Sequence, residues 1–219
     1  MKDNINNEPN PVTTSIKELL RRTDMTCNAR YNAAVRMSLH GWASQWTLAI
    51  LVVGQIAISL IASLNVHKNF SNDYINFGSI FFGVLVLAYS LLLGMADFSS
   101  RSVKLHSCGL ELGRLSRKLF YLSQSNDESL ENYEKCYTQY YDILDKYENH
   151  SPIDYLQAHH KYYIGEALKL NVETLIYWTE RLRLFRIWLK IWIYRFLQFS
   201  HYAISISLIS AWIFVLVRK

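Results

Sequence analysis

The chemistry-bearing residues that come closest to a metal site are three histidines, His150, His159 and His160. Imidazole is a common metal ligand, but a site needs several such groups directed at one ion. Adjacent helical residues point about 100° apart, so His159 and His160 do not readily face the same ion. We interpret these histidines as surface or capping residues and expect no metal site.

Acidic residues near these histidines do not suggest catalysis either. Four of them could pair as proton donors and acceptors, but they share an exposed face with Lys146: Asp142, Asp145, Glu148 and Asp154. The sequence has no GxxxxGK[ST] or GxGxxG phosphate loop and no GxSxG nucleophile elbow. We therefore expect neither an enzyme activity nor a bound cofactor.

A more informative set of polar residues lies inside a long apolar stretch. Gln55, Ser59 and Ser63 recur every four residues and therefore share one face of a helix. Polar groups that face lipid are costly, so this face should meet protein or water. Two interpretations are open, namely hydrogen bonds between helices or the lining of an aqueous pore. A pore would need a homo-oligomer, because two spans of one chain cannot enclose one.

Small residues in the next apolar stretch predict close helix contacts. Ser79 with Gly83, and Ser90 with Gly94, have the spacing that lets two helix backbones approach. This spacing is also compatible with a homo-oligomer. Asp97 follows the stretch, where it would face cations at the mouth of a pore or lie in interfacial water.

Two stretches that carry these residues are long enough to cross a bilayer. Residues 46–66 and 77–95 run for about 21 and about 19 residues without a charge, against a hydrocarbon core of about 30 Å. No acidic residue occurs between Asp24 and Asp73. A buried hairpin in a soluble bundle is the alternative, but core helices rarely run so far without a charge. We predict a transmembrane hairpin.

Lysine and arginine indicate the orientation of this hairpin. Arg30 and Arg36 precede the first span, and Lys68 is the one basic residue of the connecting loop. Several basic residues follow the second span: Arg101, Lys104, Arg114, Arg117 and Lys118. Because cytoplasmic segments are enriched in basic residues, we expect both ends of the hairpin in the cytoplasm and its loop outside the inner membrane.

A third candidate span covers residues 199–217. In the stretch before it, 185–198, apolar and basic residues fall on opposite helical faces, which predicts an amphipathic helix in the headgroup layer. His201 and several serines make this span less apolar than the other two. An amphipathic helix packed on a soluble body is therefore the alternative.

The remaining segments also have helical patterns. Ser15 opens a capping-box pattern that predicts a helix to about Leu39, and Gly41 predicts a break before the first span. Ser151 and Pro152 have the residue types of an N-cap and a first helical position. An aromatic stripe between these segments predicts packing and not base stacking: Tyr133, Tyr137, Tyr140, Leu144 and Tyr147.

Together these patterns predict an all-α membrane protein with long cytoplasmic helices. We expect a disordered tail at 1–14, a basic helix at 15–41, a transmembrane hairpin at 42–96, a cytoplasmic helical body at 97–184, and an amphipathic helix leading into a third transmembrane helix at 185–219. The net charge of +5 is concentrated beside the spans, where anionic lipid attracts basic residues. We therefore expect the lipid bilayer, and not nucleic acid, as the partner of the basic residues.

Two short segments carry a family resemblance. Arg30, Tyr31 and Asn32, with Arg36, precede the first span, and a second segment lies in the helical body: Glu148, Asn149, His150, Asp154 and Tyr155. Together they resemble the SLATT family of SMODS and SLOG-associating two-transmembrane effectors. The second segment is similar to the branch with an "ENHxxxDY" sequence that is often associated with reverse transcriptases. The likeness covers about residues 19–163.

The resemblance implies a membrane effector of a bacterial anti-phage conflict system. Such an effector would stay idle until a partner senses infection, and would then assemble or open and breach the inner membrane. The implied partner is a nucleotide-signal synthase, a nucleotide sensor or a reverse transcriptase. The alternative is a non-enzymatic membrane anchor whose helical body recruits a cytoplasmic partner.

Overall fold

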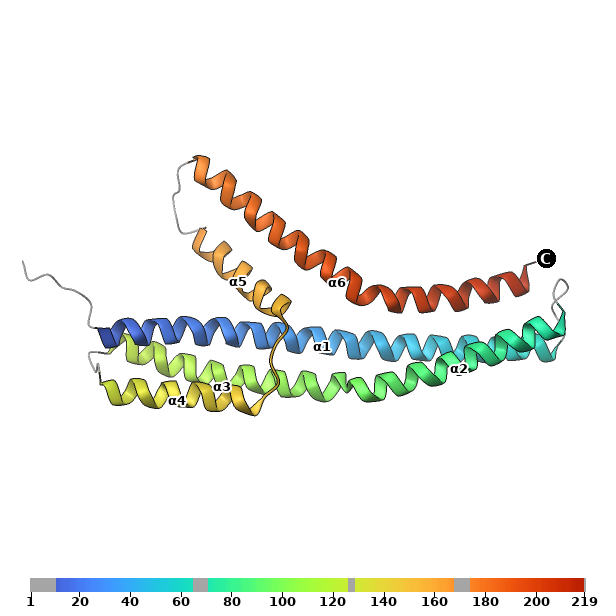
Figure 1. Cartoon of the computed structure of the whole chain (residues 1–219), viewed down its shortest axis with the longest axis horizontal. Coiled ribbons are helices and arrows are strands. Elements are labelled where there is room, and N and C mark those ends of the chain that lie inside the picture. The colour runs from blue at the N-terminus through green and yellow to red at the C-terminus, as the bar shows by residue number, and fades with distance from the viewer. Residues whose placement is uncertain (1–10, 65–70, 126–128, 168–173, 219) are drawn as a thin grey trace, which may run out of the picture. The chain divides into compact units, whose positions relative to one another are not determined.

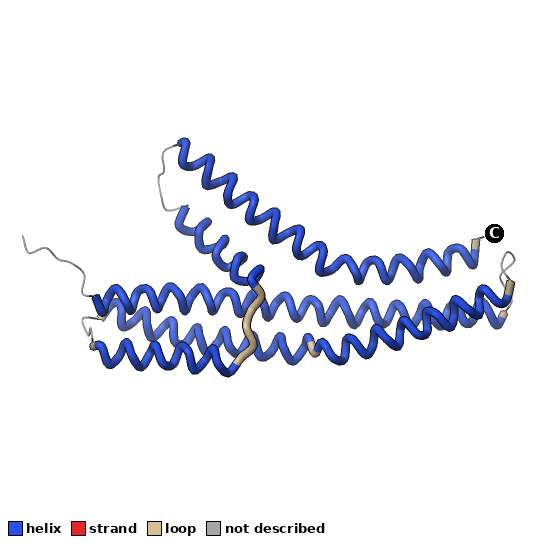
Figure 2. The backbone as a smooth tube through the Cα atoms, viewed as in Figure 1, coloured by secondary structure: helices blue, strands red, loops and turns tan. Residues whose placement is uncertain are grey.

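The structure is a computed structural model that describes residues 11–64, 71–125, 129–167 and 174–218. Within these residues every element is an α-helix, as predicted (Figures 1 and 2). In chain order the helices are α1 (Pro11–Ser63), α2 (Asn72–Ala96), α3 (Phe98–Gln124), α4 (Leu130–Lys146), α5 (Pro152–Ala167) and α6 (Thr174–Val217).

The chain divides into two compact units, each with its own core. The helical body comprises the described residues of 1–35 and 102–191, and the membrane unit comprises those of 36–101 and 192–219. Two long helices, α1 with 53 residues and α6 with 44, contribute to both units without interruption.

Three helical stretches are long and apolar enough to cross a membrane: Pro11–Ser63, Asn72–Gln124 and Arg181–Val217. Their most apolar windows have mean hydropathies of 2.0, 2.2 and 1.8, and the protein itself buries only 22%, 6% and 17% of them. Because so much continuous apolar surface is unfavourable in water, lipid covers it. The protein is thus an all-α membrane protein with a third, C-terminal candidate span.

The start of α1 differs from the prediction. The helix begins at Pro11, whose fixed φ suits a first helical turn, so residues 11–14 of the predicted tail are helical. The rest of that tail, 1–10, lies outside the described residues. Ser15 lies inside the helix, where its Oγ donates to Pro11 O at 2.9 Å. The predicted capping box at Ser15 is therefore wrong, because the proline already starts the helix.

The predicted break at Gly41 is also wrong, since α1 continues through it. A glycine inside a helix costs only about 1 kcal/mol, which the helical turns on both sides outweigh. A Cβ at this position would lie 3.6 Å from Phe98 Cβ, which is an ordinary van der Waals contact, so the start of α3 lies beside Gly41 without requiring a glycine there. At the other end of the hairpin, α2 begins at Asn72 after the N-cap Ser71, within the segment 67–76 that we expected to form a loop.

The core of the helical body is formed by one face each of α1, α3 and α4. It contains Ile16, Leu19, Cys27, Cys108, Leu112, Leu115, Leu119, Cys136, Tyr140 and Ile143. Tyr133, Leu144 and Tyr147 pack against this cluster, which confirms the packing role of most of the aromatic stripe. Tyr137 is the exception, because it is 43% exposed and its ring lies 4.9 Å from that of Tyr141.

The core of the membrane unit joins the hairpin to the third span. Its buried residues come from α1, α2 and the C-terminal part of α6: Leu51, Ile58, Ile75, Phe82, Ile209 and Leu216. The C-terminal span is therefore packed against the hairpin as part of one three-helix unit, rather than standing apart from it.

Candidate functional site

The polar stripe of the first span forms hydrogen bonds to the second span. Gln55 Nε2 donates to Ser79 O at 2.7 Å and to Ser79 Oγ at 3.1 Å. Ser59 Oγ lies 3.2 Å from the same hydroxyl and donates to Gln55 O at 3.1 Å. In this structure the side chains of Gln55 and Ser59 thus join α1 to α2.

The third residue of the stripe has a different environment. Ser63 Oγ donates to Leu60 O, within its own helix, at 3.1 Å. With Ser59 and Ser79, Ser63 lines a cleft of about 350 Å³ between α1 and α2, and the remaining lining residues are Ala62, Asn72, Ile75 and Asn76. Gln55 and Ser59 are therefore hydrogen-bonded to α2, whereas Ser63 lines the cleft that begins beside them.

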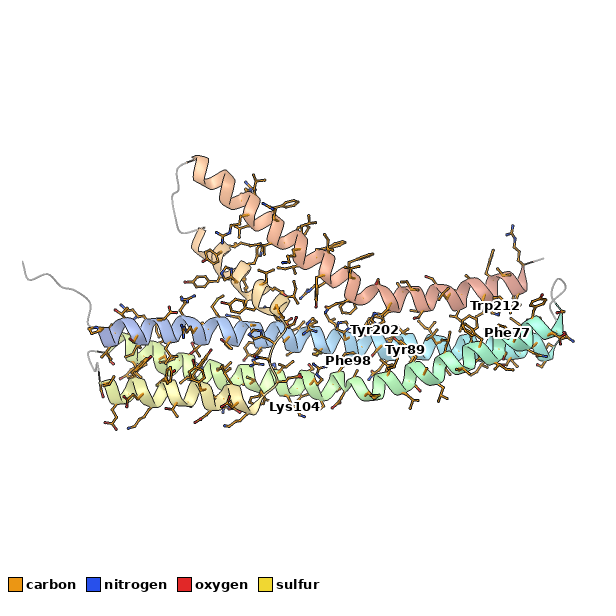
Figure 3. The ribbon with its side chains drawn as sticks, viewed as in Figure 1. Phe77, Tyr89, Phe98, Lys104, Tyr202 and Trp212 are labelled. Carbon is orange, nitrogen blue, oxygen red and sulfur yellow. The ribbon has the colours of Figure 1, made fainter. Side chains whose placement is uncertain are left out.

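Glycines determine how closely the three spans approach. Gly83 faces the stripe, because a Cβ there would lie 3.6 Å from Gln55 Nε2. A Cβ at Gly54 would lie only 2.6 Å from Ile209 Cδ1, and one at Gly78 only 2.7 Å from Trp212 Cζ2 (Figure 3 labels Trp212). Sequence reasoning missed Gly54 and Gly78, since neither has a small residue four positions away.

The other predicted small-residue pair makes no such contact. Ser90 Oγ donates to Leu87 O at 2.8 Å, and a Cβ at Gly94 would meet nothing within 4 Å. Leu91 and Met95 beside it are 62% and 83% exposed. This part of α2 is therefore open at Gly94, with the half-buried Ser90 one turn before it.

Asp97 is the joint between α2 and α3. It is the C-cap of α2 with φ of 41°, the one non-glycine residue with a positive φ among those described. Aspartate tolerates this left-handed conformation better than most residues. Its carbonyl oxygen accepts a hydrogen bond from Arg101 N at 3.1 Å and so begins α3. The side chain of Asp97 is exposed.

A buried histidine of α1, His40, contacts the start of α3 and α6. Its Nδ1 lies 3.0 Å from Tyr202 Oη, and its ring stacks on Phe199 and Phe98 at centroid distances of 4.3 and 5.4 Å (Figure 3 labels Phe98 and Tyr202). Burial, with added repulsion from Arg36 and His201, lowers the pKa of His40 to about 4. The ring is therefore neutral at pH 7. Sequence reasoning missed it, because a single histidine ahead of a span has no spacing that marks it.

The two family segments meet in the helical body. Arg30 on α1 is only 1% exposed, and its guanidinium donates to Glu148 O and, at 3.1 Å, to Asn149 Oδ1. Asn32 Nδ2 donates to Asp154 O at 3.2 Å. The first segment therefore holds the connection between α4 and α5 against α1.

The second segment organises the start of α5. Asp154 Oδ2 accepts a hydrogen bond from Ser151 N at 3.0 Å, and α5 begins at Pro152, as predicted. His150 stacks on Tyr155 with ring centroids 5.8 Å apart, and burial, together with Arg30, lowers the pKa of His150. The contacts of the second segment therefore stabilise the start of α5.

Tyr31, another residue of the first family segment, fills the space beside a glycine of α3. A Cβ at Gly109 would lie 2.9 Å from Tyr31 Cε1, and the Tyr31 ring lies 5.3 Å from that of His106. The close approach of α1 and α3 thus depends on the missing side chain of Gly109.

The histidines of α5 contact different groups. His160 Nε2 lies 3.1 Å from Leu184 O, whereas the ring of His159 packs on Tyr163 at 4.4 Å. Among the residues that the structure describes, no group of three His, Cys, Asp or Glu side chains could hold a metal ion.

Comparisons with known proteins identify the family. A search of curated proteins and a search of solved structures returned no match. A family model described as "SMODS and SLOG-associating 2TM effector domain family 5" matches residues 12–211. The match is wider than the resemblance at 19–163, and it includes the hairpin, both family segments and most of the third span. The chain therefore belongs to SMODS and SLOG-associating 2TM effector domain family 5.

Proposed function

We propose that this protein is the membrane effector of a bacterial anti-phage conflict system, and that it forms a pore as a homo-oligomer in the inner membrane. Family membership supports the effector role. The observation that carries the pore is the hydrogen-bonded polar group of Gln55, Ser59 and Ser79 within otherwise uncharged spans. Polar side chains at this depth are costly in lipid and are commonly retained where a path for water or ions is needed.

The hydrogen bonds of this group suit a resting state that can open. Gln55 and Ser59 are bonded inside the hairpin, so neither depends on water while the protein is at rest. A hydrogen bond within a protein contributes only about 1 kcal/mol net, because water can replace its partner. On activation, these side chains would break their hydrogen bonds to one another, form hydrogen bonds to water and line the pore.

Assembly would use the uncovered part of α2. Ser90 and Gly94 form a small-residue surface that allows close approach of a second copy. The helical body and the N-terminus would lie in the cytoplasm, where a partner can reach them. Because the family description names association with SMODS and SLOG proteins, the proposed trigger is a nucleotide-signal synthase or a nucleotide sensor. A reverse transcriptase is a further proposed trigger, which rests on the resemblance of the segment from Glu148 to Tyr155 alone.

The test is membrane potential in cells that carry the gene with its neighbours and receive a phage trigger. Triggered cells should depolarise, and the double variant Gln55→Leu, Ser59→Leu should abolish this while still inserting. Leu60→Ala, at a lipid-exposed position of the same helix, is the matched control and should depolarise like the native chain. A trigger that kills the cells without changing their membrane potential would rule out the pore.

A membrane anchor is the second candidate, favoured by exposed aromatic rings on the helical body. Phe120 and Tyr121, at the end of α3, are 58% and 73% exposed, as expected of a surface that binds a partner. This function predicts that an unrelated hairpin can replace residues 42–96 with activity retained, whereas the pore predicts loss of activity.

A further inference from the structure

The cleft between α1 and α2 is polar, although both helices are apolar. Of its seven lining residues, two are apolar, Ala62 and Ile75. The other five have hydroxyl or amide side chains: Ser59, Ser63, Asn72, Asn76 and Ser79. Lipid tails are poor occupants of such a cleft, because they offer no hydrogen-bonding groups to a polar lining.

The cleft runs from one end of the hairpin toward its middle. Asn72 is the first residue of α2, at the end where the chain connects α1 to α2. Ser63 lies about 6 Å along α1 from Ser59, at about 1.5 Å per residue. Ser59 and Ser79 at the inner end are bonded to Gln55, which is one residue from the centre of the uncharged run 46–66.

A buried acceptor lies just behind this inner end. Gln55 Oε1 is buried and accepts no hydrogen bond from any described residue. Next to it along the hairpin the helices meet through apolar side chains, with Leu51 and Phe82 in the buried core. The polar surface therefore stops near mid-depth.

We propose that this cleft is a water-filled inlet, which brings water and small hydrated cations from the loop side of the membrane to Ser59 and Ser79 in the resting subunit. None of its described lining residues is basic, and the exposed Asp73 follows Asn72 at its mouth, so among the described residues the local charge favours cations over anions. The inference rests on the proposed membrane insertion and orientation, and it is independent of pore formation.

Single cysteines provide the test in the full-length protein, in spheroplasts treated with a membrane-impermeant, positively charged thiosulfonate. Ser59→Cys and Ser79→Cys probe the cleft. Their neighbours Leu60→Cys and Ile80→Cys, at lipid-exposed positions, probe the same depth outside it. The three native cysteines are buried, and burial raises the pKa of each thiol, so the native chain serves as the blank.

The cleft cysteines should react at least about tenfold faster than their neighbours, because the reactive thiolate forms only where water is present. For each reagent, the rate at Ser59→Cys is divided by the rate at the exposed Tyr74→Cys. This ratio should be smaller for a negatively charged thiosulfonate than for the positively charged one. Equal rates for Ser59→Cys and Leu60→Cys, and for Ser79→Cys and Ile80→Cys, would overturn the inlet. Reaction only in inside-out vesicles would instead show that the proposed orientation is reversed.

Discussion

Arg30 is a buried cation held by neutral acceptors. Its guanidinium donates to the carbonyl of Glu148 and the amide oxygen of Asn149, and its Nε is buried without a partner among the described residues. A planar guanidinium can reach two acceptors at once, whereas an ammonium group is a single point of charge. The Arg30 side chain therefore links α1 to the segment ahead of α5 through hydrogen bonds.

Arg30→Lys should consequently loosen the helical body. We expect a loss of about 2 kcal/mol, the typical contribution of hydrogen bonds that involve a charged group. Thermal unfolding of the full chain in detergent measures this loss. Arg114→Lys, at an exposed position, should change the unfolding midpoint little. An equal decrease of the midpoint in both variants would contradict the proposed role of Arg30 in linking α1 to the segment ahead of α5.

His40 predicts a pH dependence of stability. Burial lowers the pKa of His40 to about 4 in the folded state, whereas a released histidine titrates near about 6.5. The unfolded state therefore binds the proton first as the pH falls. The stabilising contribution of neutral His40 should be complete above pH of about 6.5 and should decrease as the pH falls toward about 4.

The charged and titratable groups around this ring are Arg36 on α1 and His201 and Tyr202 on α6. Unfolding midpoints at neutral and mildly acidic pH measure the effect. His40→Phe keeps the stack on Phe199 and removes the titration, so its acid-induced drop should be smaller than that of the native protein. An unchanged drop would show that other groups cause it.

At the scale of elements, two glycines determine whether α6 can join the hairpin. Gly78→Val would place methyl groups against the Trp212 ring, where even a Cβ would be 2.7 Å away. Overpacking of this kind typically costs about 1–3 kcal/mol, so the unfolding midpoint should fall. Gly94→Val is the matched control in the same helix, because a Cβ there meets nothing within 4 Å. Equal stability of the two variants would contradict the packing of the third span.

The helices themselves were largely predictable, because charged residues are excluded from lipid and the membrane spans therefore stand out as long uncharged runs in the sequence. The uncharged runs at 46–66 and 77–95 identified the hairpin, and Pro152 identified the start of α5. Where elements end was harder to predict. Pro11 and Ser15 are both start signals for α1, and the sequence does not show which one begins the helix. The cost of Gly41 likewise competes with the helical turns on both sides of it.

Contacts between elements were the least predictable part. The stripe at Gln55 was recognisable from its spacing, but its bond to Ser79 depends on the register between α1 and α2. Gly54, Gly78 and His40 became identifiable only once α6 was packed beside them, since their partners are distant in sequence. The left-handed conformation of Asp97 likewise results from the turn between two packed helices.

At the scale of the whole molecule, the proposed assembly depends on the uncovered surface of α2. The Gly94→Val variant should fold like the native chain, because the position is open within the subunit. It should nevertheless weaken association, because a larger side chain keeps two helix backbones apart. The mass of the native complex, measured in detergent or nanodiscs, tests this. If Gly94→Val forms a complex of the same mass as the native chain, the interface between subunits does not include Gly94.

The most direct test of the pore is ion flux through proteoliposomes that contain the purified chain, with and without its partner and the partner's activating ligand. We predict that activated partner increases dye or ion release, and that the Gln55→Leu, Ser59→Leu variant inserts equally well but shows no increase. If native protein and the double variant release the same amount under activation, the polar group of the hairpin does not line a conducting path.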